Sequence, residues 1–121
     1  MKQLTGPELL SMLGAGDARA AGGAGLANAA PVLLDVREPW EFALAAIHIE
    51  GLRTLPMPMD EIAGRLDEFD PRQPVVCICH HGMRSAQVVA FLERQGFEAA
   101  YNLDGGIDAW SEQVDAGVPR Y

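Results

Sequence analysis

Two short runs of apolar residues constrain the fold of this 121-residue chain more than any other feature. Residues 32–36 read Val-Leu-Leu-Asp-Val, and residues 75–79 read Val-Val-Cys-Ile-Cys. Neither run alternates between apolar and polar residues, which is typical of strands that are covered on both faces. Such strands occur mainly in parallel sheets with helices on either side, so the two runs predict an α/β fold.

Helical patterns separate the apolar runs. Thr5 and Glu8 form a capping-box pattern that predicts a short first helix. Pro39 suits the first turn of a helix that extends through Ala45. Further patterns predict helices over 59–69, over 85–95 with Gly96 as the C-terminal cap, and over 107–114, and a third strand over 99–103. Strands and helices therefore alternate, which favours a mainly parallel central sheet flanked by helices.

One segment departs from this pattern. Residues 14–30 contain five Gly and eight Ala, a composition typical of a flexible loop. A short Ala-rich helix around residues 18–21 is the alternative. The length of the chain fits one ordinary domain, so we expect residues 1–121 to form a single unit that includes this loop.

The charge and hydropathy of the chain exclude several classes of partner. A formal net charge of −8 argues against nucleic acid and anionic membrane surfaces, because both would repel the protein. Charged residues or prolines interrupt every apolar run well before the roughly 18 residues that a membrane span needs. The first residues carry no apolar stretch of the kind found in secretory signals, so we expect a cytoplasmic protein.

Cys77 and Cys79 are the only cysteines. On a strand they would share one face about 6.6 Å apart, too far for a relaxed disulfide. Cys79 stands at the carboxyl end of its strand, where open α/β sheets bind ligands. The short loop after it contains Gly82 and leads into a helix, an arrangement that would direct backbone N–H groups at a sulfur and hold it as a thiolate.

Other readings of these residues stay open. Cys79 could be a buried strand cysteine that only packs, and Cys77 is better explained as inert core than as a thiol that resolves a Cys79 intermediate. The spacing of the two cysteines, His80 and His81 lacks the paired ligands of structural zinc sites, so no metal is expected. His80 and His81 could bind a substrate anion, move a proton or be solvated loop residues.

Five segments, in order along the chain, form a recognisable pattern. The segment Cys79-His80-His81-Gly82-Met83-Arg84-Ser85 resembles the active-site loop of the rhodanese family of sulfurtransferases. The resemblance runs over roughly residues 31–121, and the other four segments are Leu33-Leu34-Asp35-Val36-Arg37-Glu38, His48-Ile49-Glu50-Gly51 with Leu55-Pro56, Leu103-Asp104-Gly105-Gly106-Ile107-Asp108-Ala109-Trp110, and Ala116-Gly117-Val118-Pro119.

The resemblance implies a three-layer rhodanese-like fold and an enzyme that moves sulfane sulfur from a donor such as thiosulfate to a thiol or to cyanide. Cys79 would be the catalytic nucleophile and would form a persulfide. The substrate-binding loop would comprise His80, His81, Gly82, Met83, Arg84 and Ser85. Asp35 and Arg37 would order the loop and its entrance. The resemblance requires no cofactor and no metal.

The resemblance also sets expectations for partners and for the surrounding charges. We expect a small sulfur donor, a thiol or protein acceptor, and a monomer or weak homodimer. Arg84 could contact substrate, but pairing with a carboxylate to brace the loop is the favoured interpretation. Glu38 and Glu41 are interpreted as charges at a helix start.

Two other functions compete with sulfur transfer. Cysteine phosphatases and arsenate reductases of related fold have five residues between their Cys and Arg, whereas four separate Cys79 from Arg84. The shorter loop should be too small for a tetrahedral oxyanion. Rhodanese-like domains also serve as non-catalytic binding or regulatory modules, and the cysteine and its complete loop argue against that function.

Overall fold

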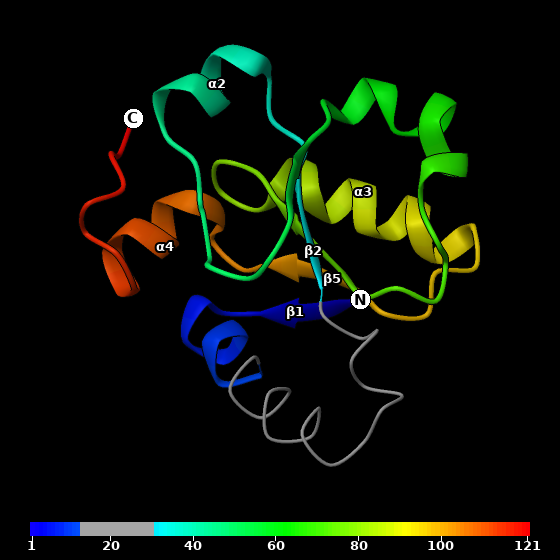
Figure 1. The fold of residues 1–121 in the computed structure, drawn as a ribbon, viewed down its shortest axis with the longest axis horizontal. Helices are drawn as coiled ribbons and strands as arrows, with labels where there is room; N and C mark the ends of the chain where they lie inside the picture. Colours follow the sequence, from blue (N-terminus) through cyan, green and yellow to red (C-terminus); the bar gives the residue numbers. More distant parts are fainter. Residues whose placement is uncertain (13–30) are drawn as a thin grey trace.

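A computed structural model describes residues 1–12 and 31–121, so the predicted flexible loop at 14–30 lies outside the described residues. The described residues form one sheet with the strand order β1-β5-β4-β2-β3. Helices and loops surround this sheet (Figure 1). The elements are β1 Lys2–Leu4, a helix over residues 6–12, β2 Val32–Asp35, α2 Pro39–Leu44, β3 Thr54–Pro56, η2 Met59–Glu61, η3 Ala63–Glu68, β4 Val75–Ile78, α3 Met83–Arg94, β5 Ala100–Leu103 and α4 Gly106–Gln113.

Every pairing in this sheet is parallel, which confirms the predicted fold class. The central strand β4 lies between β2 and β5, and Cys77 is in register with Leu34 on one side and Asn102 on the other. Because parallel strands end at the same edge, the residues that close β2, β4 and β5 lie near one another. This edge carries Asp35, Cys79 and Asn102.

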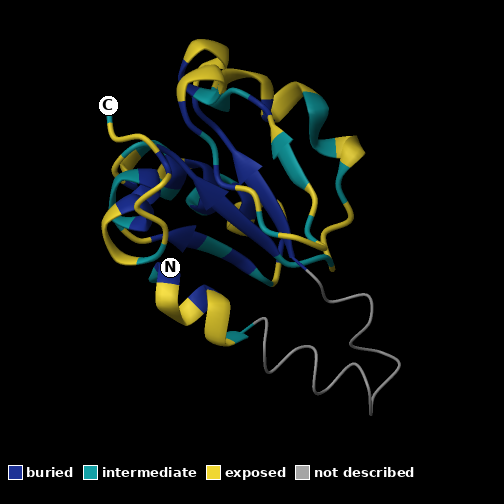
Figure 2. Ribbon diagram, turned by 60° about the vertical axis from the view of Figure 1, so that its left-hand side comes forward, coloured by how far each residue is buried: buried dark blue, intermediate teal, exposed yellow. Residues whose placement is uncertain are grey.

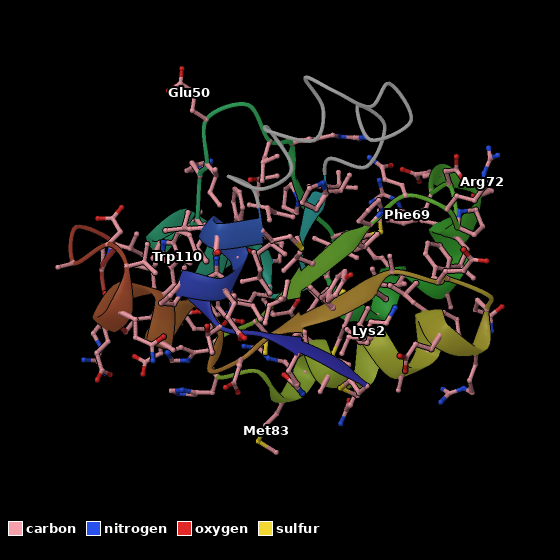
Figure 3. The ribbon with its side chains drawn as sticks, turned by 90° about the horizontal axis from the view of Figure 1, so that it is seen from below. Lys2, Glu50, Phe69, Arg72, Met83 and Trp110 are labelled. Atoms are coloured by element: carbon pink, nitrogen blue, oxygen red, sulfur yellow. The ribbon has the colours of Figure 1, made fainter. Side chains whose placement is uncertain are left out.

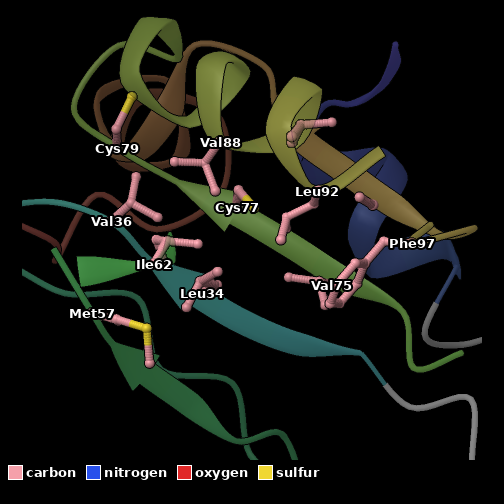
Figure 4. Close-up of a cluster of buried hydrophobic side chains, with 12 residues drawn as sticks. Leu34, Val36, Met57, Ile62, Val75, Cys77, Cys79, Val88, Leu92 and Phe97 are labelled. Atoms are coloured by element: carbon pink, nitrogen blue, oxygen red, sulfur yellow. The ribbon is translucent and has the colours of Figure 1, made fainter. Parts of the chain in front are cut away.

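The two faces of the sheet bury separate apolar clusters, which makes the three layers that the sequence predicts. Helix α3 covers one face, where its Val88 and Leu92 pack against β2 and β4 (Figure 4). The helix over 6–12 and α4 cover the other face through Leu9, Ile107 and Trp110. Buried residues follow the central strands, and exposed ones lie on the outer surfaces of the helices (Figure 2).

The capping signals in the sequence act as predicted. The Thr5 N–H donates to Glu8 Oε1 at 2.9 Å, and the Glu8 N–H donates to Thr5 Oγ1 at 3.1 Å, which completes the first capping box. Gly96 follows α3 with φ of 95°, as expected of a glycine that ends a helix. Of the helices in the described ranges, none is long and apolar enough to span a membrane.

The prediction of one helix over residues 59–69 is wrong. This region forms the two 3₁₀ helices η2 and η3, and Arg65 leaves the helical region with φ of −126°. Gly64, a poor helix former, precedes that break. Ile62, Leu66 and Phe69 still pack against the core, because their spacing brings one face of either helix type toward the sheet.

The sequence did not predict the two edge strands. β1 and β3 have three residues each, and all of these residues are exposed or half-buried. Pro56 is the last residue of β3. Proline has no N–H to donate, so within a sheet it is confined to edge strands, strand ends and bulges. Such strands depend on a neighbour that is already in place, so their own residues carry little signal.

Candidate active site

Cys79 follows the last residue of β4 and begins a four-residue connection to α3. Its side chain points to the α3 side of the sheet (Figure 4), and the residue is 1% exposed. The Gly82 N–H donates to Cys79 Sγ at 3.0 Å, and Ser85 Oγ lies 3.2 Å from the same sulfur. Cys79 therefore lies beside a backbone donor and a hydroxyl group that can stabilise an anionic sulfur.

Helix α4 holds the other side of this connection. The N–H groups of Ile107 and Asp108 donate to the carbonyls of Cys79 and His80 at 2.9 and 3.1 Å. A Cβ at Gly106 would lie 2.3 Å from the Cys79 carbonyl oxygen, so only glycine permits this approach. The double glycine of the sequence motif thus lets the start of α4 fix the connection that follows Cys79.

Arg84 at the start of α3 pairs with Glu41 of α2. Its Nη1 and Nη2 lie 2.6 and 2.8 Å from the two carboxylate oxygens of Glu41. The hydrogen bond from Arg84 lowers the pKa of Glu41 to about 2. Arg84 therefore has the carboxylate partner that the bracing interpretation requires, and Glu41 does more than the helix-start charge that we expected.

Tyr121 joins this pair to a second one. Its hydroxyl donates to Glu41 Oε2 at 2.8 Å and accepts from Arg37 Nη1 at 2.8 Å. Its ring stacks on His80 with centroids 4.0 Å apart. Sequence reasoning missed Tyr121, because its partners lie some 80 residues away and no local pattern marks it.

Arg37 and Asp35 form a buried ion pair at the end of β2. Arg37 Nε and Nη2 lie 2.8 and 2.6 Å from the two Asp35 oxygens. Arg37 also donates to the backbone carbonyls of Glu41 and Ala45. The pair thus fixes α2, the helix that carries Glu41. Because Glu41 pairs with Arg84, the pair supports the loop indirectly.

The remaining loop residues differ in exposure. His80 lies between the rings of His81 and Tyr121, and burial lowers its pKa below the ordinary value. The His81 side chain is 63% exposed, with Nδ1 3.9 Å from Asp108 Oδ2. Met83 projects from the start of α3 and is 78% exposed (Figure 3).

Asn102 at the end of β5 is a site residue that the sequence did not reveal. Its Oδ1 lies 2.5 Å from Ser85 Oγ, and its Nδ2 donates to the Gly82 carbonyl at 3.1 Å. It is 3% exposed. The sequence does carry one signal for Asn102. It is a polar residue in an otherwise apolar strand end beside the double-glycine motif, and a buried polar residue needs a hydrogen-bond partner.

Cys77 occupies the interior of the same strand. It is 0% exposed and packs in the apolar cluster under α3. Burial and the neighbouring Cys79 raise the pKa of its thiol. Within residues 1–12 and 31–121, both cysteines are free and no group of three His, Cys, Asp or Glu side chains lies close enough to hold a metal.

Known proteins share the sequence pattern and the overall fold of this chain. Residues 17–113 match the family model described as a rhodanese-like domain. The chain belongs to the rhodanese family. It is 36% identical over 94 residues to the Rhodanese-like/PpiC domain-containing protein 12, chloroplastic, of Arabidopsis thaliana; the match covers 74% of the chain and 30% of that relative.

Two solved structures show how far the similarity to other rhodanese-like domains extends. A rhodanese-like domain protein from Staphylococcus aureus has 30% identity and a TM-score of 0.69, and the match covers 100% of this chain and 99% of that one. A NAD-dependent persulfide reductase from A. fulgidus has 32% identity and a TM-score of 0.55 over 66% of this chain and 14% of that one. The domain therefore occurs both alone and within longer proteins.

Proposed function

We propose that this rhodanese-like domain is a sulfurtransferase that carries sulfane sulfur as a persulfide on Cys79. The position of the Cys79 sulfur supports this proposal most directly. It lies at the carboxyl end of a central strand and contacts the Gly82 N–H and the Ser85 hydroxyl. Both donors favour a negative charge on sulfur, which nucleophilic attack requires and a persulfide retains.

The reaction has two steps. The Cys79 thiolate attacks the outer sulfur of thiosulfate, a bond forms between the two sulfurs, and sulfite leaves with the electron pair of the broken bond. An acceptor thiolate or cyanide then attacks the outer sulfur of the Cys79 persulfide. The bond between Cys79 Sγ and the outer sulfur breaks, its electron pair stays on Sγ, and Cys79 becomes a thiolate again.

The charges around the loop bear on the choice of donor. Glu41 neutralises Arg84, and Asp108 pairs with Arg120 and lies near His81. The loop therefore offers less positive charge to a dianion such as thiosulfate than its sequence implies. An organic persulfide carries at most one negative charge at its sulfane sulfur group, whereas thiosulfate carries two. It is the second donor that we propose, and the similarity to part of a persulfide reductase supports it.

The test is an intact mass measurement after incubation with thiosulfate or with glutathione persulfide. We expect the wild type to gain one sulfur atom, cyanide to remove it as thiocyanate, and Cys79→Ala to gain none. Cys77→Ala is the matched control and should gain sulfur as the wild type does. A gain that survives in Cys79→Ala but not in Cys77→Ala would contradict the proposal.

The alternative functions give different results in the same preparation. A binding module would take up no sulfur from either donor and would keep its biological activity as Cys79→Ser. A phosphatase would hydrolyse an aryl phosphate. We expect no such hydrolysis, because Glu41 occupies both terminal nitrogens of Arg84 that would otherwise hold a phosphate.

A further inference from the structure

The hydroxyl of Ser85 has two neighbours that compete for it. Ser85 Oγ lies 2.5 Å from Asn102 Oδ1 and 3.2 Å from Cys79 Sγ. A serine hydroxyl has one proton, so it donates to one of them at a time. The proton therefore has two positions, one toward Asn102 and one toward sulfur.

The orientation of the Asn102 amide is fixed by its other contacts. Its Nδ2 donates to the Gly82 carbonyl at 3.1 Å and to Gln3 Oε1 of β1 at 3.0 Å. A backbone carbonyl only accepts hydrogen bonds, so the amide nitrogen must face Gly82 and the amide oxygen must face Ser85. Asn102 thus presents a buried acceptor to the hydroxyl.

We infer that Asn102 is a positioning residue that competes with Cys79 for the Ser85 proton and thereby sets how readily the sulfur is held as an anion. When Cys79 is a thiol, its S–H donates to Ser85 Oγ, and the Ser85 hydroxyl donates to Asn102 Oδ1. When the sulfur becomes a thiolate or a persulfide anion, the hydroxyl turns to donate to sulfur and leaves Asn102 Oδ1 without that partner. Each rotation of the Ser85 hydroxyl exchanges one hydrogen bond for another and transfers no electrons.

Asn102 also touches the second group that contacts sulfur. Its Nδ2 holds the carbonyl of Gly82, the residue whose N–H reaches Cys79 Sγ. One buried amide therefore acts on both donors of the sulfur site. The inference rests on the proposed function for its purpose, since an anionic sulfur is the working state of a sulfurtransferase.

A double-mutant cycle separates this coupling from other effects of the same substitutions. We would measure the pH profile of Cys79 alkylation by iodoacetamide in the wild type, Asn102→Asp, Ser85→Ala and the double variant. Cys79→Ala gives the background from Cys77, which is fully buried. The other charged or titratable residues on the elements around the loop are the same in every variant of the cycle; these are Arg84, Glu41, Cys77, His80, Asp108, Tyr121, and the pair of Asp35 and Arg37.

Asn102→Asp keeps the acceptor, strengthens it and removes the donor to Gly82. We expect the midpoint of the profile to rise by about one pH unit when Ser85 is present, which corresponds to about tenfold slower alkylation below the midpoint. The added charge also acts through space, but it does so equally in both backgrounds. In the Ser85→Ala background, which lacks the hydroxyl, we expect less than half of that shift.

Equal shifts in the two backgrounds would overturn the inference, because Asn102 would then act independently of Ser85. If Asn102→Asp does not fold, Asn102→Thr, which suits a β-strand, takes its place in the cycle. Threonine lacks the amide acceptor, so the midpoint should fall when Ser85 is present, and equal shifts in the two backgrounds again overturn the inference. Alkylation needs no sulfur donor. A chain with coupled shifts that takes up no sulfur would refute the proposed function alone, and a chain that takes up sulfur with additive shifts would refute this inference alone.

Discussion

Cys77 and Cys79 are two residues apart and belong to the same apolar cluster under α3, yet their polar surroundings differ. Cys77 lies within β4, where apolar side chains enclose it and burial raises the pKa of its thiol. Cys79 lies one residue past the strand and has two polar donors within reach. Exposure does not separate them, since they are 0% and 1% exposed. Their difference shows that the end of a parallel strand can supply donors to a thiol as deeply buried as one in the core.

The physical origin of this difference is the geometry of the chain after the strand. Inside β4, every backbone N–H and C=O can pair with β2 or β5, so none is free to turn toward a side chain. Past Ile78 the chain turns away from the ladder. Its carbonyls then bind the start of α4, and the N–H of Gly82 turns to sulfur.

Exchanging each cysteine for alanine gives the largest expected effect and tests the comparison directly. Cys79→Ala should lower the rate of sulfur transfer by about 10³-fold or more, because no other group can hold the sulfur. Cys77→Ala should transfer sulfur at close to the wild-type rate and lose about 1 kcal/mol of stability through the small cavity it leaves. Thiocyanate production and urea unfolding measure the two effects. A Cys77→Ala variant that is stable but inactive would break the comparison.

A change at Gly82 tests whether its N–H distinguishes the Cys79 site. Gly82 has φ of 101°, and a Cβ there would lie 3.3 Å from the backbone nitrogen of Gly105. Gly82→Ala should displace the N–H from sulfur and slow sulfur transfer by about 100-fold, the usual effect of losing one such donor. Gly96→Ala is the matched control, because Gly96 has φ of 95° and open space around its Cβ position.

Both glycine variants should lose roughly 1–3 kcal/mol of stability from the strained backbone. Steady-state rates per folded molecule, with thermal unfolding measured beside them, separate strain from chemistry. If the two variants transfer sulfur equally fast per folded molecule, the contact between Gly82 and sulfur has no effect on the rate.

The sequence was sufficient to predict the parts of the fold that local physics determines. The continuous apolar runs at β2 and β4 require cover on both faces, and the capping box at Thr5 and the glycine after α3 mark helix ends. It also predicted that Cys79 stands at a strand end before a helix. These features depend on residues close together in the chain, so a pattern reveals them.

The rest depends on partners far away in the chain. Glu41 pairs with Arg84 from 43 residues away, and Tyr121 reaches Glu41 from 80 residues away. Asn102 contacts Ser85 because β5 lies beside β4. The local sequences of the two strands do not reveal that they are neighbours in the sheet. The edge strands β1 and β3 likewise form only where a neighbour offers unpaired backbone groups.

Acid should loosen the Cys79 loop while the core around Cys77 stays closed, the smallest effect we expect. The pKa of Glu41 in the folded chain is about 2, below its ordinary 4.5, so its pairing with Arg84 stabilises fully above pH 4.5 and is lost as the pH falls toward 2. We expect a loss on the order of 2 kcal/mol, discounted because Arg84 is partly exposed. Amide hydrogen exchange, corrected for its intrinsic pH dependence, should show Gly82 losing protection between pH 6 and pH 3 while Val76 keeps it.

Glu41→Gln lacks the ion pair at any pH, so its Gly82 amide should exchange faster at pH 6 and change little on acidification. If Val76 loses protection together with Gly82, the loop and the core open as one unit, and the two cysteines differ in chemistry but not in local stability.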